Sequence, residues 1–387
     1  MTDLADPASH KATQQTEPPL AGGNVSQSSW LKVLLGLAGL VVTAVVMLNV
    51  FISFRDFPQW YGNSRILIGI VAIVVGVGGT GLLFRFLNML IEGLPQRISL
   101  KVMPYAYLLP GFGLMTLMLL YPTVQTVMYS FANKDSTAWV GFENYTTIFG
   151  QQGFRESLLN NLLWLIFVPA ITVALGIVVA VLADKLSSRG ESFAKSVIFL
   201  PMAISFVGAS AIWNLVYDYT SGANQTGLLN QLWTMVGGEP QTWLQNSTLH
   251  LNSFLLMVIL VWLQVGFAMT LLSSAIKGVP EDTLEAARID GASEWQIFWK
   301  VVLPQIKGTT ITVFITVLIL VLKIFDIIFV LTNGKYNTNV IANLYYFTAF
   351  KSQNAGTSSA IVVVLLVAIL PVLIYQVRHF RAEEANR

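Results

Sequence analysis

The segment 158–183 reads LLNNLLWLIFVPAITVALGIVVAVLA and contains no charged residue. A helix rises about 1.5 Å per residue, so this run is long enough to cross a hydrocarbon core about 30 Å thick. Apolar residues make up 55% of the chain and charged residues 11%, against roughly 45–50% and 25% in ordinary soluble proteins. The run therefore predicts a membrane-spanning helix, and the composition indicates that it is one of several.

Seven further apolar runs flank this segment on both sides. The eight predicted spans are 31–54, 66–87, 105–131, 158–183, 197–217, 252–276, 309–332 and 358–375. Each run is apolar all round rather than on one face, as expected of helices in contact with lipid. The chain is therefore predicted to be an all-α, polytopic membrane protein with about eight transmembrane helices.

Charge placement predicts the orientation of these spans. If both termini are cytoplasmic, fifteen Lys and Arg residues lie in inside segments and six lie outside, as the positive-inside rule requires. Residues 1–29 are polar and lack the features of a signal peptide, which predicts a disordered cytoplasmic tail. The longest outside segment, 218–251, contains no Lys or Arg and predicts an extracytoplasmic cap or docking surface.

Several classes of function are excluded by composition. Without cysteine there is no disulfide or thiolate metal site, and the three histidines lie too far apart in sequence to predict a metal cluster. A net charge of +2 gives no basic field for nucleic acid. Gly76, Gly78 and Gly81 form a G-x-G-x-x-G without a preceding strand, so we interpret them as small residues for close helix packing.

The loop 277–307 is too polar to enter lipid. Its residues that favour helix starts, turns and helix ends predict two short helices. A proline followed by two acidic residues favours the start of the first helix. Gly291 allows the chain to reverse, and Ser293 with Gln296 predicts a capping box for the second helix. Pro304 predicts the end of that helix, because proline lacks the backbone donor.

Residues Glu285, Ala286, Ala287, Gly291, Leu303 and Pro304 stand at the spacing of the EAA loop of binding-protein-dependent ABC importer permeases. The run 287–293, ARIDGAS, is similar to the carbohydrate-importer version of this loop. In that family the loop sits in a cleft of the ATPase subunit. The resemblance therefore implies that ATPase coupling depends on Glu285, Ala286, Ala287, Arg288, Asp290 and Gly291.

The resemblance covers residues 102–387 and implies a six-helix permease core there, with two accessory transmembrane helices over 30–101. The C-terminal run 375–378, YQVR, resembles permeases for α-glucosides and glucosylglycerol, within the maltose-type larger subunits. Two departures from the family pattern are Asn160-Asn161, where Asn-Thr is usual, and Lys335-Tyr336, where Gly-Pro is usual.

Family membership would place the chain in the bacterial inner membrane as a multi-pass subunit. The implied partners are a second permease subunit of different sequence, an ABC ATPase dimer and an extracytoplasmic solute-binding protein. No Walker A motif occurs in the sequence, so ATP and Mg are expected on the ATPase subunits. This chain is accordingly expected to be a transport subunit without cofactor or ATPase activity of its own.

Polar residues inside the predicted spans mark a candidate solute path. Lys323 and Asp326 are spaced to share one face near the middle of the seventh span, where charges either line pathways or pair for structural reasons. Gln264 lies between aromatic residues that suit a sugar ring, although a lone glutamine is more often a contact between helices. The path residues so predicted are Trp262, Gln264, Phe267, Lys323, Phe325 and Asp326.

Rival functions from other classes stay open. An ion-coupled secondary carrier would use Lys323 and Asp326 for coupling and would need no EAA loop, and inverted repeats, which are not evident, would favour it. A membrane receptor or scaffold is a third possibility. The expected function is an alternating-access permease subunit for a carbohydrate or sugar-like solute, such as an oligosaccharide, an α-glucoside or a glycosyl polyol.

Overall fold

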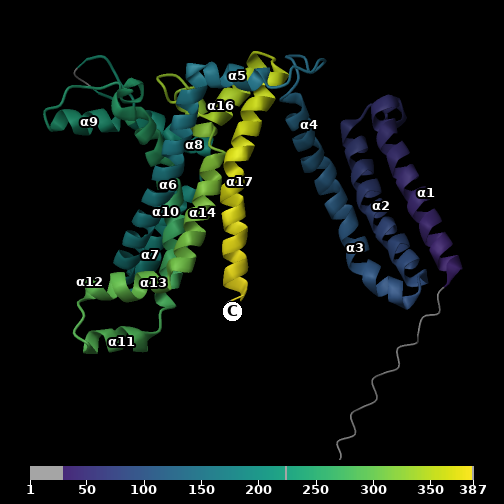
Figure 1. Ribbon diagram of the computed structural model, residues 1–387, viewed down its shortest axis with the longest axis horizontal. Coiled ribbons are helices and arrows are strands. Elements are labelled where there is room, and N and C mark those ends of the chain that lie inside the picture. Colours follow the sequence, from purple (N-terminus) through teal and green to yellow (C-terminus); the bar gives the residue numbers. More distant parts are fainter. Residues whose placement is uncertain (1–28, 223–224, 386–387) are drawn as a thin grey trace, which may run out of the picture. The chain divides into compact units, whose positions relative to one another are not determined.

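The structure, a computed structural model, describes residues 29–222 and 225–385 (Figure 1). Within these residues the chain is helical apart from its loops, and the β-type pairing is one isolated bridge between Ala132 and Trp139. The all-α prediction is confirmed. The predicted tail over 1–29 lies, except for Ser29, outside the described residues.

The chain divides into two compact units, Met1–Tyr121 and Pro122–Arg387. The first unit contains α1 (Trp30–Asp56), α2 (Arg65–Gly93), α3 (Gln96–Met115) and a π-helical turn, Thr116–Leu120. The division falls inside the third predicted span, whereas the resemblance places the start of the core at residue 102. That earlier boundary stays a prediction.

The second unit carries the long central helices and the loops between them. Its helices are α4 (Tyr121–Tyr129), α5 (Glu143–Gly150), α6 (Gln152–Asp184), α7 (Ser188–Phe199), α8 (Phe206–Val216), α9 (Leu228–Met235), α10 (Leu251–Lys277), α11 (Glu281–Ile289), α12 (Glu294–Ile297), α13 (Leu303–Gln305), α14 (Lys307–Leu322), α15 (Asp326–Leu331), α16 (Ile341–Tyr346) and α17 (Ala355–Ala385).

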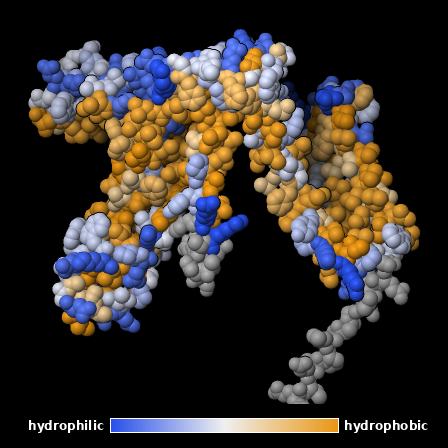
Figure 2. Space-filling model, viewed as in Figure 1, coloured by the Kyte–Doolittle hydropathy of each residue, from blue (hydrophilic) through white to orange (hydrophobic). Residues whose placement is uncertain are grey.

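Among the described residues, six helices are long and apolar enough to cross a membrane, and the number reaches eight if each of two bent helix pairs counts as one span. In Figure 2 the long helices of the second unit carry a hydrophobic surface, with hydrophilic residues gathered toward their two ends. This distribution is that of a membrane protein, in which lipid surrounds the hydrophobic middle of the helices and water surrounds their hydrophilic ends. The predicted number of about eight spans agrees with this result.

Glycines bring α1 and α2 into close contact within the first unit. A Cβ added at Gly36 would lie 2.6 Å from the backbone nitrogen of Leu90, and one at Gly79 would lie 2.4 Å from the sulfur of Met47. By contrast, nothing lies within 4 Å of a Cβ added at Gly76, Gly78 or Gly81. The prediction that those three glycines serve helix packing is therefore wrong within this unit, where Gly36 and Gly79 form the close contacts instead.

The core of the second unit is built on α6 and α10. A Cβ added at Gly176 of α6 would lie 2.7 Å from the Cβ of Ala268 in α10, so the two backbones approach closely. Trp164 of α6 is fully buried in an apolar cluster with residues of α10 and α14. This pair of helices is the scaffold on which the broken spans and the loops are positioned.

The predicted span 197–217 is bent, and a second bend joins the last loop helix to α14. The pair Ser188–Ala203 and Phe206–Val216 bends by 104°, and α10 passes so close to this bend that a Cβ at Gly266 would lie 2.4 Å from the carbonyl oxygen of Ile198. The pair Glu294–Gln305 and Lys307–Leu322 bends by 70°. The continuous helix expected over 197–217 is thus replaced by two half-helices that meet at an angle.

The second predicted loop helix does not end at Pro304. It runs from α12 through a π-helical turn, Phe298–Val302, into α13, which includes Pro304 and ends at Gln305. A π-helical turn shifts the hydrogen-bond register, and this shift provides a place for a proline inside a helical segment. The helix end lies one residue later, at the bend into α14.

Candidate functional site

The loop between α10 and α14 forms the predicted pair of helices. Gly291 adopts a φ of +78°, in the left-handed region that favours glycine, and reverses the chain after α11. The Oγ of Ser293 accepts from the backbone N–H of Gln296, and the side chain of Gln296 accepts from the N–H of Ser293. The predicted turn and capping box are both present in the structure.

An ion-pair bridge joins the two helices of this loop. The Nε of Arg288 donates to Oε1 of Glu294 at 2.9 Å, and its Nη1 lies 3.6 Å from Oε1 of Glu281. The hydrogen bond to Glu294, with a smaller contribution from Glu281, raises the pKa of Arg288 above its ordinary value. Arg288 stays charged at any working pH and ties the start of α12 to α11.

Most of the predicted coupling residues are exposed on one surface of the loop, and the opposite surface packs against the rest of the subunit. Glu285, Ala286, Arg288 and Asp290 are exposed, whereas Ala287 packs against an apolar cluster that also includes residues of α10 and α14. A pocket of about 370 Å³ opens between the two helices, lined by Ala287, Asp290, Gly291, Ala292, Gln296, Lys300 and Val301. The loop is therefore a firm projection with a concave, partly charged face.

The root of the loop is fixed by a charged cluster at the ends of α6, α7 and α10. Oε1 of Glu191 accepts from the Nζ of Lys195 and from the Nζ of Lys277, each at 2.5 Å. Lys277, the last residue of α10, also lies 3.3 Å from Oδ1 of Asp184. The ends of α6, α7 and α10 are thus tied together through the carboxylates of Asp184 and Glu191.

The residues of the predicted solute path do not gather at one place. Trp262 makes an edge-to-face contact with Trp213 of α8 and packs against the cluster that contains Ile324. Phe267 packs instead against the cluster that adjoins the coupling loop, and Phe325 stacks on Phe329 with ring centroids 5.0 Å apart. The structure brings Trp262 near the break after α14, in which Phe325 lies, and places Phe267 against a different cluster.

Gln264 is nearly buried within α10. Its exposed fraction is 7%, and among the described residues its amide makes no hydrogen bond to another residue of the chain. The alternative that Gln264 forms a hydrogen bond between helices of this chain therefore finds no partner here. Its amide is free to bond with a group from outside the subunit.

Lys323 and Asp326 do not share a helical face, contrary to the prediction. The helix α14 ends at Leu322, Lys323 is its C-cap, and Asp326 is the first residue of α15. Hydrophobic periodicity cannot show such a break, since both flanking segments are equally apolar. Across the described residues no ion pair joins these two charges to each other or to a third residue.

Lys323 lies at the end of α14 and is exposed there. The sixteen residues of α14 rise about 1.5 Å each, so Lys323 lies about 24 Å beyond Lys307. Its side chain is exposed on the surface of the subunit, whereas the intervening Ile324 is 2% exposed. A charge at this depth needs water or a charged partner from outside this chain.

Three buried asparagines form a polar site that the sequence reasoning missed. Nδ2 of Asn160 donates to the carbonyl oxygens of Asn337 and Asn339, at 2.6 and 2.9 Å. Oδ1 of Asn161 accepts from the N–H of Ile341, and Nδ2 of Asn252 donates to the carbonyl oxygen of Tyr336. These asparagines hold the loop 332–341 to α6 and α10.

The two departures from the family pattern therefore meet in space, since the pair Asn160-Asn161 binds the backbone that follows Lys335-Tyr336. The loop carries positive φ values at Asn333, Gly334, Tyr336 and Asn337, a conformation that needs outside support. The sequence did contain a signal for this site, namely two consecutive asparagines in an otherwise apolar span. Their side-chain amides must find hydrogen-bond partners when they are buried.

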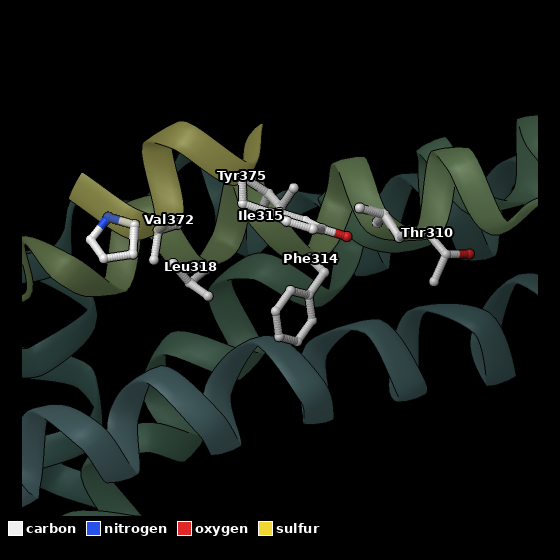
Figure 3. Close-up of a pocket in the computed structure, with 8 residues that line it drawn as sticks. Thr310, Phe314, Ile315, Leu318, Val372 and Tyr375 are labelled. Carbon is white, nitrogen blue, oxygen red and sulfur yellow. The ribbon is translucent and has the colours of Figure 1, made fainter. Parts of the chain in front are cut away.

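An apolar groove of about 480 Å³ opens between α14 and α17 (Figure 3). It is lined by Thr310, Ile311, Phe314, Ile315, Leu318, Pro371, Val372 and Tyr375. None of the predicted path residues is among them. Hydroxyl groups at two positions and hydrocarbon elsewhere suit an acyl chain or another helix better than a sugar.

A family model described as "Binding-protein-dependent transport system inner membrane component" matches residues 172–382. The alpha-glucoside transport system permease protein AglF of Rhizobium meliloti is 44% identical over 293 residues, 75% of this chain and 86% of the relative. The osmoprotective compounds uptake permease protein GgtC of Synechocystis is 48% identical over 282 residues, 73% of this chain and 100% of the relative.

A solved structure has the same fold at lower identity. It is a bacterial ABC transporter involved in the import of the acidic polysaccharide alginate, and its matching chain has a TM-score of 0.64 and 21% identity, covering 74% of this chain and 99% of that one. The matched family region includes the whole coupling loop and the break after α14. This chain therefore belongs to the family of binding-protein-dependent transport system inner membrane components, the membrane-spanning permeases of ABC importers.

Proposed function

We propose that this permease subunit imports an α-glucoside or a glycosyl polyol at the expense of ATP hydrolysed by a partner. The observation that carries the proposal is the coupling loop, a firm two-helix projection with Glu285, Ala286 and Asp290 exposed beside a 370 Å³ pocket. The solute class is supported by the two relatives named for alpha-glucosides and for osmoprotective compounds.

The ATPase and its nucleotide belong to other subunits in this proposal. The sequence contains no Walker A motif, so ATP and Mg are held by an ATPase dimer that docks on the coupling residues. A second permease subunit and an extracytoplasmic binding protein complete the importer, and one related structure is a transporter in complex with its periplasmic protein. Both termini lie in the cytoplasm in this proposal, in accord with the excess of Lys and Arg in the inside segments.

The solute passes along the surface that includes Trp262, Gln264 and the break after α14. Support comes from the free amide of Gln264 and from the exposed charge of Lys323, both of which call for groups outside this chain. The hydroxyl groups of a sugar match the amide, and its ring matches an indole face. Phe325 and Asp326 line the same break, and Phe267 lies closer to the coupling loop.

The test is reconstitution of the complete importer in proteoliposomes, with its ATPase and its binding protein. We expect trehalose, maltose or glucosylglycerol to raise the rate of ATP hydrolysis and to accumulate inside the vesicles. Glu285→Lys abolishes this stimulation, because it reverses a charge on the docking surface. Glu92→Lys makes the same change at an exposed position of α2 in the first unit, outside the coupling loop and the loop 218–251, and leaves stimulation intact.

Stimulation that survives Glu285→Lys would contradict the coupling role. ATP hydrolysis by the isolated chain would contradict its assignment as a subunit without an ATPase site. Stimulation by amino acids or metal chelates, with none by glycosides, would reject the solute class and leave the family assignment untouched. Uptake that follows an ion gradient without ATP would favour the secondary carrier.

A further inference from the structure

The helix α9 carries an exposed apolar stripe. Leu228, Leu232, Met235 and the following Val236 are 52%, 53%, 79% and 77% exposed, and their spacing places them on one helical face. The loop that contains them, residues 218–251, has no Lys or Arg. A water-facing helix of eight residues does not keep four large apolar side chains on one face unless something covers them.

The opposite face of α9 is firmly attached to the rest of the loop. Asn230 is fully buried, and its Nδ2 donates to the carbonyl oxygens of Asp218 and Gln241. Its Oδ1 accepts from the N–H of Gln241 and from Nε1 of Trp243. With every hydrogen-bonding position of one side chain in use, the rotation of α9 about its axis is set, and the stripe points away from the loop.

The attachment also sets the depth of α9. Asp218, which accepts from Asn230, follows the last residue of α8 by two positions. Tyr217 donates its hydroxyl to the carbonyl oxygen of Leu255, in the second turn of α10. The helix α9 therefore lies at the level where two membrane spans end, at the end of the bundle opposite the coupling loop (Figure 1).

The direction of the stripe agrees with this depth. In Figure 1 α9 runs across the direction of the long helices. In Figure 2 the α9 region is hydrophobic on the side that faces along the bundle and hydrophilic on the outer side, so its apolar surface continues the apolar surface of the spans.

We propose that α9 is an interfacial helix, whose stripe of Leu228, Leu232, Met235 and Val236 inserts among the lipid headgroups and upper acyl chains of the outer leaflet. The lipid surface is chosen as occupant because the stripe is continuous with the lipid-facing surface and the helix lies in the plane of the interface. Anchored in this way, α9 holds the loop 218–251 at a fixed height for an incoming partner.

The chain has no cysteine, so single-cysteine variants can be spin-labelled without background. Leu232→Cys and Met235→Cys place a nitroxide in the stripe, and Glu239→Cys places one in the exposed part of the same loop. The full importer is reconstituted in nanodiscs of phosphatidylethanolamine and phosphatidylglycerol. We measure the collision rates of each label with oxygen, which concentrates in lipid, and with a nickel chelate, which stays in water.

We expect the ratio of oxygen to nickel accessibility to be several-fold higher at positions 232 and 235 than at position 239. Equal ratios at the three positions would overturn the proposal. Low accessibility to both reagents at 232 and 235, with crosslinks from these cysteines to the second permease subunit, would also overturn it and assign the stripe to a protein contact. If either label prevents assembly, Leu228→Cys and Val236→Cys report on the same stripe.

Discussion

The coupling loop and the loop 332–341 lie at opposite ends of the same bundle, and they are held in different ways. In the coupling loop the supports are local: a capping box between Ser293 and Gln296, and a bridge from Arg288 to Glu294 six residues away. In the loop 332–341 the supports are remote, since Asn160 reaches carbonyl groups 177 and 179 residues along the chain.

The difference follows from the solvent around each loop. Water surrounds the coupling loop, so its backbone groups can bond to water and its charged pairs contribute little to stability. The backbone of the loop 332–341 is partly enclosed by apolar helices, where each carbonyl without a donor costs free energy. We therefore expect substitutions in the remote supports to disturb the whole subunit, and those in the local supports to disturb only the loop.

The largest effect is expected for Asn160→Ala. The substitution leaves two carbonyl groups beside a buried helix without a donor, which costs about 1–3 kcal/mol for each unsatisfied group. We expect a lower thermal unfolding temperature of the solubilised subunit and less assembled importer. Asn49→Ala is the matched control, because Asn49 is exposed and donates only to Val45 within its own helix. Equal unfolding temperatures of the two variants would contradict the comparison.

A pair of glycine substitutions tests the same difference at a single backbone conformation. Gly334 and Gly291 have φ values of +74° and +78°, so alanine at either position costs about 1–2 kcal/mol in backbone strain. A Cβ at Gly334 would also lie 2.6 Å from atoms of Asn339 and Asn343, whereas nothing lies within 4 Å at Gly291.

Gly334→Ala should accordingly lower the unfolding temperature of the subunit more than Gly291→Ala. The latter should chiefly reduce the solute-stimulated rate of ATP hydrolysis, because it loosens the turn of the coupling loop. Both quantities are measured on the same reconstituted preparations. A larger loss of stability from Gly291→Ala would reverse our assignment of local and remote supports.

A smaller effect is expected for Ser293→Ala. Loss of the capping side chain costs about 1 kcal/mol of helix stability, confined to the start of α12. Hydrogen exchange of the amides around residues 293–297 should become faster, with no change in exchange at α6. Ser293→Thr keeps the hydroxyl and should behave as the unsubstituted chain, and faster exchange in that variant would show that the cap is not the support.

The smallest effect is expected for Arg288→Gln. Its ion pairs to Glu281 and Glu294 are exposed, so salt screens them and the unfolding temperature should not change. At low ionic strength the amides of α11 should exchange faster in the variant than in the unsubstituted chain. In molar salt the two exchange rates should become equal, because the ion pairs are screened in both. A stability loss that persists in molar salt would mean that Arg288 supports more than its own loop.

The sequence predicted the spans and the coupling loop because the signals for both are local. A run such as 158–183 is long and apolar enough to need lipid whatever surrounds it. Gly291 with the Ser293 and Gln296 pair defines a turn and a cap within a few residues. For this loop the sequence predicted which residues lie at the surface and how the helices begin, although not how Pro304 fits into a π-helical turn.

The sequence by itself determined that the chain is a helical membrane protein with a polar two-helix loop. These features depend on interactions between residues close in sequence and on whether each segment prefers water or lipid. Only the tertiary structure decided that α14 stops at Leu322, that Lys323 and Asp326 lie apart, and that Asn160, Asn161 and Asn252 hold a distant loop. The physical reason is that a buried amide bonds to whichever backbone group packing brings within 3 Å, and no local pattern encodes that partner.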